Sequence, residues 1–251
     1  MKSSLINYQY SPNILKNKNL LITGSTDGIG RALAIKASKL GAQVILHGKN
    51  KSKLENLYDE IKKLPGVSCP SIALLDLANA DENDYINFAK NIEGEFGKLD
   101  GLVHNAAILG NLGPIEQYDP AEWQMVIHIN LTAPFVLTQV LLPCLKHAKH
   151  SSIIFTTSSV GKSGKAFWGA YSVSKFGIEG LNQILAEENK HKSLRVNCID
   201  PGPVNTKMRL QAYPGENRKN LKNPDDILPA YIFLLGDDSM GLSGNSYILQ
   251  Q

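Results

Sequence analysis

The chain alternates short apolar segments with longer helical segments, and this order constrains its fold more than any other feature. Strands are expected at residues 20–22, 44–47, 72–75, 102–104, 152–156, 195–199 and 247–249. Helices are expected at residues 29–40, 52–64, 84–96, 120–146, 170–189 and 225–235. Strands joined through helices run parallel with right-handed crossovers, and the helices cover both faces of the sheet. The pattern predicts an α/β, single-domain Rossmann fold, a doubly wound parallel sheet of about seven strands.

The length of 251 residues fits one such domain. Residues 1–17 form an N-terminal extension before the first strand, and residues 203–224 are expected to be an irregular, mobile lid over a substrate. Two local details follow from residue types. Ser52 is expected to cap the second helix, and Pro134 and Pro143 are expected to bend or break the long helix.

Composition and charge exclude several classes of protein. The formal net charge of +3 gives no strong attraction for nucleic acid. No run reaches the about 18 apolar residues of a membrane span, and the N-terminus lacks the apolar core of a signal peptide, so a cytoplasmic protein without a membrane partner is expected. Cys69, Cys144 and Cys198 are too far apart for a disulfide framework and are expected in the core. The histidines form no H-E-x-x-H motif, so we expect no metal.

A glycine-rich turn, TGSTDGIG at residues 23–30, joins the first strand to the first helix. In such a turn one glycine allows the tight bend, another lets backbone N–H groups approach a pyrophosphate, and a third lets the helix pack closely. The helix that follows directs its positive end at the anion. A simple tight turn would also use glycines, and Asp27 is expected to cap the helix or point away. The position after the first strand favours phosphate binding by Gly24, Ser25, Thr26, Gly28, Ile29 and Gly30.

Tyr171 and Lys175 lie four residues apart at the start of an expected helix, which places them on one face with Cβ atoms about 5–6 Å apart. A free tyrosine has a pKa of about 10, which is too high for efficient proton transfer near neutrality. A positive charge at about 4 Å contributes about 4 kcal/mol at an effective dielectric constant near 20. We therefore expect Lys175 to lower the pKa of Tyr171 and to make it a general acid and base.

These motifs together resemble the short-chain dehydrogenase/reductase family from about residue 20 to residue 244. Ser158 stands thirteen residues before Tyr171, the offset found in much of the family, with Ser159 as its rival. The resemblance implies that Tyr171 exchanges a proton with a carbonyl or alcohol oxygen and that Ser158 hydrogen-bonds that oxygen. It further implies that Lys175 holds the nicotinamide ribose and that Asn130 holds a water linking Lys175 to solvent.

The resemblance also implies the rest of a nicotinamide site, since each matching segment follows its own strand. The implied cofactor residues are Asp76 and Leu77 at the adenine, Asn105, Ala106 and Ala107 after the fourth strand, Tyr171 and Lys175, and Pro201, Gly202, Val204 and Thr206 after the sixth. An acid at the end of the second strand would select NAD. Here Gly48 holds that position, and Lys49 and Asn50 follow, so NADP(H) is expected over NAD(H).

The expected reaction is hydride transfer between NADP(H) and a small-molecule carbonyl compound or secondary alcohol. The expected substrate wall comprises Ile108, Leu109, Trp168, Met208 and Tyr213. Alternatives are a 3-oxoacyl-thioester reductase and a protein that senses NADP without turnover. Several segments resemble most the YciK-like bacterial oxidoreductases. The family implies a homodimer, or a homotetramer, through apolar faces of two helices: Phe135, Leu137, Val140 and Leu141 with Phe176, Ile178, Leu181 and Ile184.

Overall fold

A computed structural model of the protein describes residues 5–250 and contains one parallel sheet of seven strands in the order β3-β2-β1-β4-β5-β6-β7. The strands are β1 (Asn19–Ile22), β2 (Gln43–Gly48), β3 (Ser71–Leu74), β4 (Gly101–His104), β5 (Ser151–Thr156), β6 (Leu194–Asp200) and β7 (Ser246–Ile248). The helices are α1 (Gly28–Lys39), α2 (Lys51–Lys62), α3 (Glu82–Phe96), α4 (Pro120–Ile127), α5 (Ala133–His147), α6 (Gly169–Glu188), α7 (Lys207–Ala212) and α8 (Pro224–Leu235). The expected fold class is confirmed.

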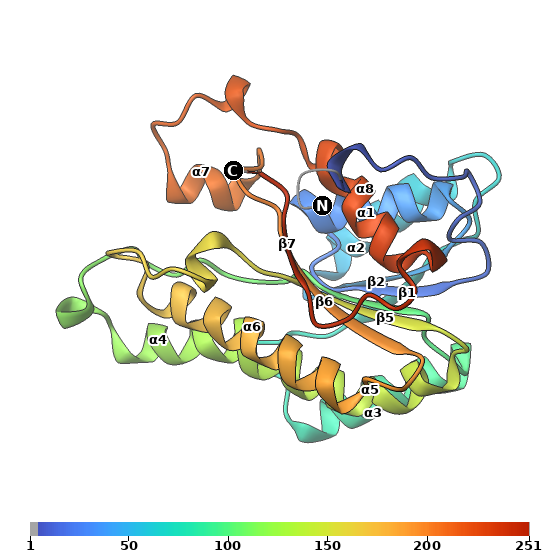
Figure 1. Ribbon diagram of the computed structural model, residues 1–251. Coiled ribbons are helices and arrows are strands. Elements are labelled where there is room, and N and C mark those ends of the chain that lie inside the picture. The colour runs from blue at the N-terminus through green and yellow to red at the C-terminus, as the bar shows by residue number, and fades with distance from the viewer. Residues whose placement is uncertain (1–4, 251) are drawn as a thin grey trace.

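Helices cover both faces of the sheet, because strands buried on both sides must be packed on both sides. Figure 1 shows α1, α2 and α8 on one face, and α3, α5 and α6 on the other. Each face has its own buried apolar cluster. The strand order reverses between β1 and β4, and ligands of such sheets bind beyond the carboxyl ends of the strands at that point.

The long helical segment is interrupted where the sequence places Pro134. Between α4 and α5 the chain forms a π-helical turn, His128–Thr132, in which the backbone N–H of Ala133 donates to the carbonyl of His128. Pro134 has no N–H to donate to the carbonyl of Asn130 four residues back, so the regular ladder cannot continue there. Pro143 lies inside α5, which runs on to His147. The irregularity therefore lies just before Pro134, and Pro143 does not end the helix.

The combined segment Pro120–His147 is long and apolar enough to cross a membrane by length and mean hydropathy, which reaches 1.7 over its best window. The sequence prediction that no run reaches the about 18 apolar residues of a membrane span considered uninterrupted runs, whereas this segment passes on its mean hydropathy. In the structure 44% of that window is buried inside the protein. Leu137, Leu141 and Leu145 are fully buried in the cluster that α5 forms with α3 and the sheet. This placement is that of a core helix.

Three local predictions need correction. The side chain that caps α2 is Asn50, which accepts a hydrogen bond from the Lys53 backbone N–H at 2.9 Å, and not Ser52. Cys144 and Cys198 are buried as expected, but Cys69 is exposed in the loop before the edge strand β3. The segment 203–224 is also less irregular than expected. It contains α7, and the Asn205 N–H donates to the Lys222 carbonyl at 2.8 Å across its base.

The described part of the N-terminal extension, residues 5–17, packs against α8 on the upper face in Figure 1. Leu15 is fully buried in the cluster on that face, and the Tyr8 ring lies 4.9 Å from that of Phe233. Lys18 Nζ lies 2.7 Å from the carboxylate of Asp237. These contacts place the extension as a cover for α8, away from the carboxyl ends of the strands.

Candidate active site

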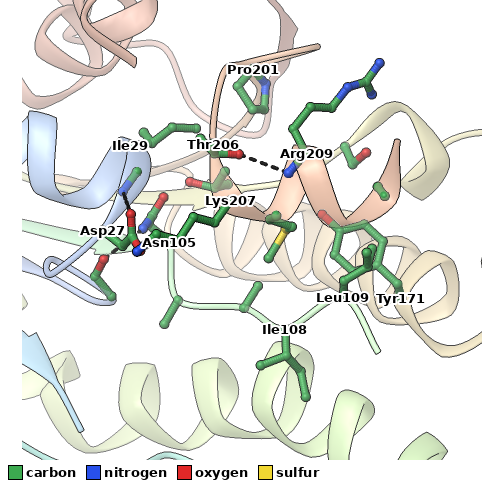
Figure 2. Close-up of a pocket in the computed structure, with 18 of the residues that line it drawn as sticks. Asp27, Ile29, Asn105, Ile108, Leu109, Tyr171, Pro201, Thr206, Lys207 and Arg209 are labelled. Carbon is green, nitrogen blue, oxygen red and sulfur yellow. Dashed lines mark hydrogen bonds and ion pairs between the residues drawn. The ribbon is translucent and has the colours of Figure 1, made fainter. Parts of the chain in front are cut away.

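A cavity of about 730 Å³ lies beyond the carboxyl ends of the strands. It runs from the glycine-rich turn to Tyr171 and under α7, and its size is within the range of ligand pockets. Figure 2 shows Asp27 at one end, Tyr171 and Leu109 at the other, and Lys207 of α7 between them. The sequence-predicted residues that line it are Gly24, Thr26, Gly28, Ile29, Lys49, Asp76, Leu77, Asn105, Ala106, Ala107, Ile108, Leu109, Ser158, Trp168, Tyr171, Lys175, Pro201, Gly202, Val204, Thr206, Met208 and Tyr213.

Four predicted residues do not line the cavity. Ser25 is buried and donates to the His47 carbonyl at 3.1 Å, so it closes the turn from behind. Gly30 packs so tightly that a Cβ would lie 2.4 Å from the carbonyl oxygen of Gly24. Asn50 caps α2, and Asn130 is buried in the π-helical turn. Their positions support the site without forming its surface.

The glycine-rich turn has a shape that other residues would not allow. Gly24 has φ of +64°, and a Cβ there would lie 2.9 Å from Ala106 Cα. Asn105 ties the end of β4 to the same turn, since its side-chain amide donates to the Thr23 carbonyl at 3.2 Å. Asp27 caps α1 as expected, accepting from the Gly28 N–H at 2.8 Å. The turn therefore presents backbone and a helix N-terminus to the cavity, which fits the pyrophosphate of a dinucleotide.

Tyr171 and Lys175 share the inner face of α6 and are almost fully buried. Lys175 Nζ lies 5.4 Å from the centre of the Tyr171 ring and donates to the Thr156 carbonyl at 2.8 Å. Burial raises the pKa of Tyr171, the charge of Asp200 raises it further, and a hydrogen bond with Ser158 opposes both. Burial lowers the pKa of Lys175 to about 8. In the protein alone burial is therefore the largest effect, and the pKa of Tyr171 is raised and not lowered.

Ser158 and Ser159 both reach the cavity, but their contacts differ. The hydrogen bond to Tyr171 comes from Ser158, which stands in extended backbone just after β5. Ser159 begins the short turn that follows. Gly161 ends that turn and lets it approach α6, since a Cβ there would lie 2.8 Å from Lys175 Cβ. The contact with Tyr171 favours Ser158 over its rival.

Asn130 uses its side-chain amide to fix backbone. Its oxygen accepts from the Ile108 N–H and its nitrogen donates to the Ile108 carbonyl, both at 2.8 Å. The nitrogen also donates to Ser174 Oγ at 3.2 Å. The side chain of Asn130 is therefore occupied, and a bound water would have to contact the Asn130 backbone carbonyl. This carbonyl lacks the usual helical hydrogen bond because Pro134, four residues later, has no N–H.

Apolar side chains wall the end of the cavity at Tyr171. Leu109 and Val160 pack with the tyrosine ring, and Trp168, Met208 and Ala212 pack against them. The Trp168 ring centre lies 5.7 Å from that of Tyr171 and 5.8 Å from that of Tyr213. Four of the five predicted wall residues, Leu109, Trp168, Met208 and Tyr213, thus meet around one space from three segments far apart in the chain.

Several cavity residues were not among the predicted site residues. Lys207 pairs with Asp27 at 2.7 Å and joins α7 to the glycine-rich turn. Asp200 is buried at the end of β6, where its carboxylate accepts from the Gly202 N–H at 3.0 Å. His47, at the end of β2, is buried with no hydrogen-bond partner for either ring nitrogen. Asp200 and His47 could have been inferred from their positions at the ends of strands. Nothing in the local sequence indicates the pairing of Asp27 with Lys207. Among residues 5–250, no three His, Cys, Asp or Glu side chains gather as metal ligands.

The fold, the glycine-rich turn and the Ser158–Tyr171–Lys175 group define a dinucleotide-binding oxidoreductase. The family model described as short chain dehydrogenase matches residues 18–217. The chain belongs to the short-chain dehydrogenase/reductase family and is an oxidoreductase.

Among its relatives is the Escherichia coli (strain K12) protein described as "Uncharacterized oxidoreductase YciK", 42% identical over 245 residues, covering 98% of this chain and 96% of the relative. A crystal structure of a short chain dehydrogenase from Salmonella enterica serovar Typhi superposes with a TM-score of 0.95 at 43% identity, covering 97% of this chain and 100% of that one. A short chain dehydrogenase from Escherichia coli CFT073, complexed with NADPH, superposes with a TM-score of 0.94 at 42% identity, covering 96% and 100%. The predicted similarity to YciK-like oxidoreductases is confirmed.

Proposed function

We propose that the protein transfers hydride between NADP(H) and a small-molecule carbonyl compound or secondary alcohol, with Tyr171 as general acid and base. The observation that carries the proposal is the buried Tyr171 hydroxyl, which faces the cavity between Ser158 and the apolar wall. The NADPH complex of the relative from Escherichia coli CFT073 supports the choice of cofactor. When bound, the nicotinamide would supply or accept the hydride.

The chain's own residues divide the remaining work. Tyr171 gives a proton to the carbonyl oxygen in reduction and removes it in oxidation. Ser158 hydrogen-bonds the same oxygen and stabilises its developing charge. Lys175, fixed to the Thr156 carbonyl beside Tyr171, supplies a positive charge close to the proton donor. Leu109, Val160 and Trp168 exclude water from this end of the cavity, which strengthens the polar contacts there.

The experiment that tests the function is NADPH oxidation, followed at 340 nm, against a panel of ketones, aldehydes, quinones and 3-oxoacyl thioesters. Turnover above the rate without enzyme supports the proposal and assigns the substrate class. The thioester arm separates a 3-oxoacyl-thioester reductase from a general carbonyl reductase. NADPH binding with no turnover across the panel would favour a sensing role instead.

The preference for NADP(H) over NAD(H) is proposed from the end of β2. Lys49 lines the cavity near Asp76. Burial raises the pKa of Asp76, but hydrogen bonds from Ala78 and Asn79, followed by the charge of Lys49, together outweigh that effect and lower the pKa. Gly48 holds the place where an acid would bind a ribose 2′-OH and repel a 2′-phosphate. A cation next to a glycine that replaces the acid suits the phosphate.

Replacing Gly48 with Asp is expected to reverse the preference. A Cβ at Gly48 would meet Thr26 Cγ2 at 3.5 Å and Leu54 Cδ2 at 3.6 Å, which is ordinary contact, so the backbone there accepts a side chain without a clash at Cβ. Repulsion of the 2′-phosphate should weaken NADPH binding by about 100-fold, a loss of about 2.7 kcal/mol, while NADH binding improves. Titration calorimetry with both cofactors measures this. Gly48→Asn is the matched control without charge, and an equal NADPH loss in it would contradict the electrostatic reason.

We also propose a homodimer through α6 and α5. Phe135, Phe176 and Ile184 are exposed on these helices, at 46%, 43% and 58%. The sequence analysis also assigned three further residues to this interface, but they are buried in the core and do not contribute to the proposed dimer contact: Leu137, Leu141 and Ile178. Light scattering at micromolar concentration tests the state, and a monomer there would overturn the proposal.

A further inference from the structure

The charges that line the cavity are almost all matched. Lys207 pairs with Asp27, and Lys49 lies near Asp76 at the adenine end. Lys175 and Asp200 lie close enough to influence each other's pKa beside Tyr171. Arg209 is held by both oxygens of Glu216, at 2.5 and 2.6 Å. The remaining charged lining residue is Lys165, which forms no ion pair among residues 5–250.

Aromatic groups hold Lys165 at the mouth of the substrate end. Its Nζ donates to the Tyr213 hydroxyl at 2.7 Å and lies 5.7 Å from the Trp168 ring centre. An ammonium has three donors, so the contact with Tyr213 leaves two for another acceptor. The indole face adds a cation–π attraction that keeps the ammonium over the ring. The positive charge therefore has a fixed place although the side chain is exposed.

Backbone strain fixes the same segment. The Trp168 N–H donates to the Lys165 carbonyl at 3.2 Å and closes a four-residue turn. Phe167 is the third residue of this turn and has φ of +73°, a region that bulky residues rarely adopt. Its carbonyl also accepts from the Gly113 N–H at 3.0 Å. Strain of this kind persists where the surroundings impose it, and it clusters at ligand sites.

Lys165 and Tyr171 lie against the same indole ring. The Trp168 ring centre is 5.7 Å from Lys165 Nζ and 5.7 Å from the Tyr171 ring centre, so the ammonium and the tyrosine ring are at most about 11 Å apart. The space along this indole is walled by Leu109, Met208 and Ala212. Figure 2 shows the Arg209 guanidinium pointing away from Tyr171. Lys165 is thus the cation that a molecule seated on Tyr171 would meet.

We propose that Lys165 is a specificity residue that selects carbonyl substrates carrying an anionic group at the end of a short spacer. The substrate class is an oxo acid with an apolar or aromatic spacer, which Trp168 covers. This inference rests on the proposed function, because Tyr171 defines where the carbonyl oxygen binds. Lys165 takes no part in proton transfer and should change affinity, not the chemical step.

The test compares 4-acetylbenzoate with its methyl ester, which differ in charge at the far end of one ring. Binding is followed in the presence of NADP by quenching of Trp168 fluorescence in a Trp123→Phe background, which leaves one tryptophan. The acid is expected to bind about tenfold more tightly than the ester, as a charge-assisted hydrogen bond provides. Lys165→Met should remove this difference by weakening the acid alone, and added salt should do the same in part. Lys165→Arg should retain it.

Lys190→Met is the matched control, because this exposed lysine pairs with Glu187 at the far end of α6. It should leave both affinities unchanged. Equal binding of acid and ester, no quenching by the acid, or an acid preference that survives in Lys165→Met each overturns the proposal. The Tyr171→Phe variant separates this inference from the function itself. It should lower turnover by about 1000-fold while the acid still binds more tightly than the ester.

Discussion

A Tyr171→Phe variant is expected to bind NADPH like the wild type and to lose about 1000-fold in kcat for carbonyl reduction. The substitution removes one hydroxyl from a buried ring that packs with Leu109 and Val160, so the apolar wall keeps its shape. The lost hydroxyl is the proton donor, and a general acid contributes about 10²–10⁴-fold. Steady-state NADPH oxidation gives kcat, and fluorescence titration gives NADPH affinity. Full turnover in the variant would remove Tyr171 from its proposed role.

Two serine variants provide the matched controls for this result. Ser158→Ala removes the hydrogen bond to Tyr171 and is expected to lower kcat by about 100-fold. Ser159→Ala changes the neighbouring hydroxyl in the same cavity wall and should retain turnover. The opposite order would transfer the role to Ser159.

The pH dependence of reduction follows from the pKa values of the tyrosine and lysine. Burial raises the pKa of Tyr171, so the hydroxyl stays protonated, and able to donate, throughout the neutral range. Lys175 has its pKa lowered to about 8, so it is charged below that pH and neutral above it. The value of kcat/KM for reduction should therefore fall as pH rises through about 8, because the free enzyme loses the lysine charge. A rate that stays constant to pH 10 would contradict a role for that charge.

The fold could be predicted from the sequence because each signal was local. Apolar runs such as Leu20–Ile22 and Ser152–Thr156 fall inside β1 and β5, and a parallel sheet follows once helices join them. The capping prediction for α2 was wrong because two neighbouring residues are both suitable caps. Asn50 and Ser52 can both cap a helix, and the side-chain oxygen of Asn50 is the one that reaches the Lys53 N–H. Cys69 was misplaced because a small apolar residue in an edge loop has no periodicity to reveal its exposure.

The site could be predicted as far as its residues follow strand ends or share a helical turn. The carboxyl end of β5 and the N-terminal end of α6 border the same cavity. This arrangement brings Ser158 close to Tyr171 and Lys175. The electrostatic balance could not be predicted, since it depends on how deeply the fold buries each group. The sequence places Lys175 one turn from Tyr171, but only the structure shows that burial dominates both pKa values. Contacts from the lid, such as Lys207 with Asp27 and Lys165 with Tyr213, join residues with no shared local pattern.

The protein is expected to lose stability steeply below pH 6.5 because two histidines are buried in the neutral state. His47 and His104 occupy the ends of β2 and β4 and are 1% and 5% exposed. His104 stacks on Phe155 and contacts Thr138 Oγ1 at 2.8 Å, while His47 packs on Phe88. Burial lowers the pKa of His47 to about 4, and burial with the nearby positive charges lowers that of His104 to about 3.

The sign of this dependence follows from proton linkage. An unfolded histidine has a pKa of about 6.5. Below that pH the unfolded chain binds protons at these two histidines, while the folded protein keeps both rings neutral. The stabilising contribution is complete above pH 6.5 and falls by about 1.4 kcal/mol per pH unit for each histidine until the folded pKa is reached. By pH 4.5 the two together cost about 5 kcal/mol, which is comparable with the whole stability of a small domain.

Urea unfolding at pH 7, 6, 5 and 4.5 measures the effect, and His47→Leu isolates one half of it. Neither ring nitrogen of His47 has a hydrogen-bond partner, so an apolar replacement loses no such bond. Between pH 7 and pH 4.5 this variant should lose about 2–3 kcal/mol less than the wild type. His191→Gln changes an exposed histidine and should match the wild type at every pH. Parallel losses in wild type and His47→Leu would show that the His47 ring is protonated as readily in the folded protein as in the unfolded chain.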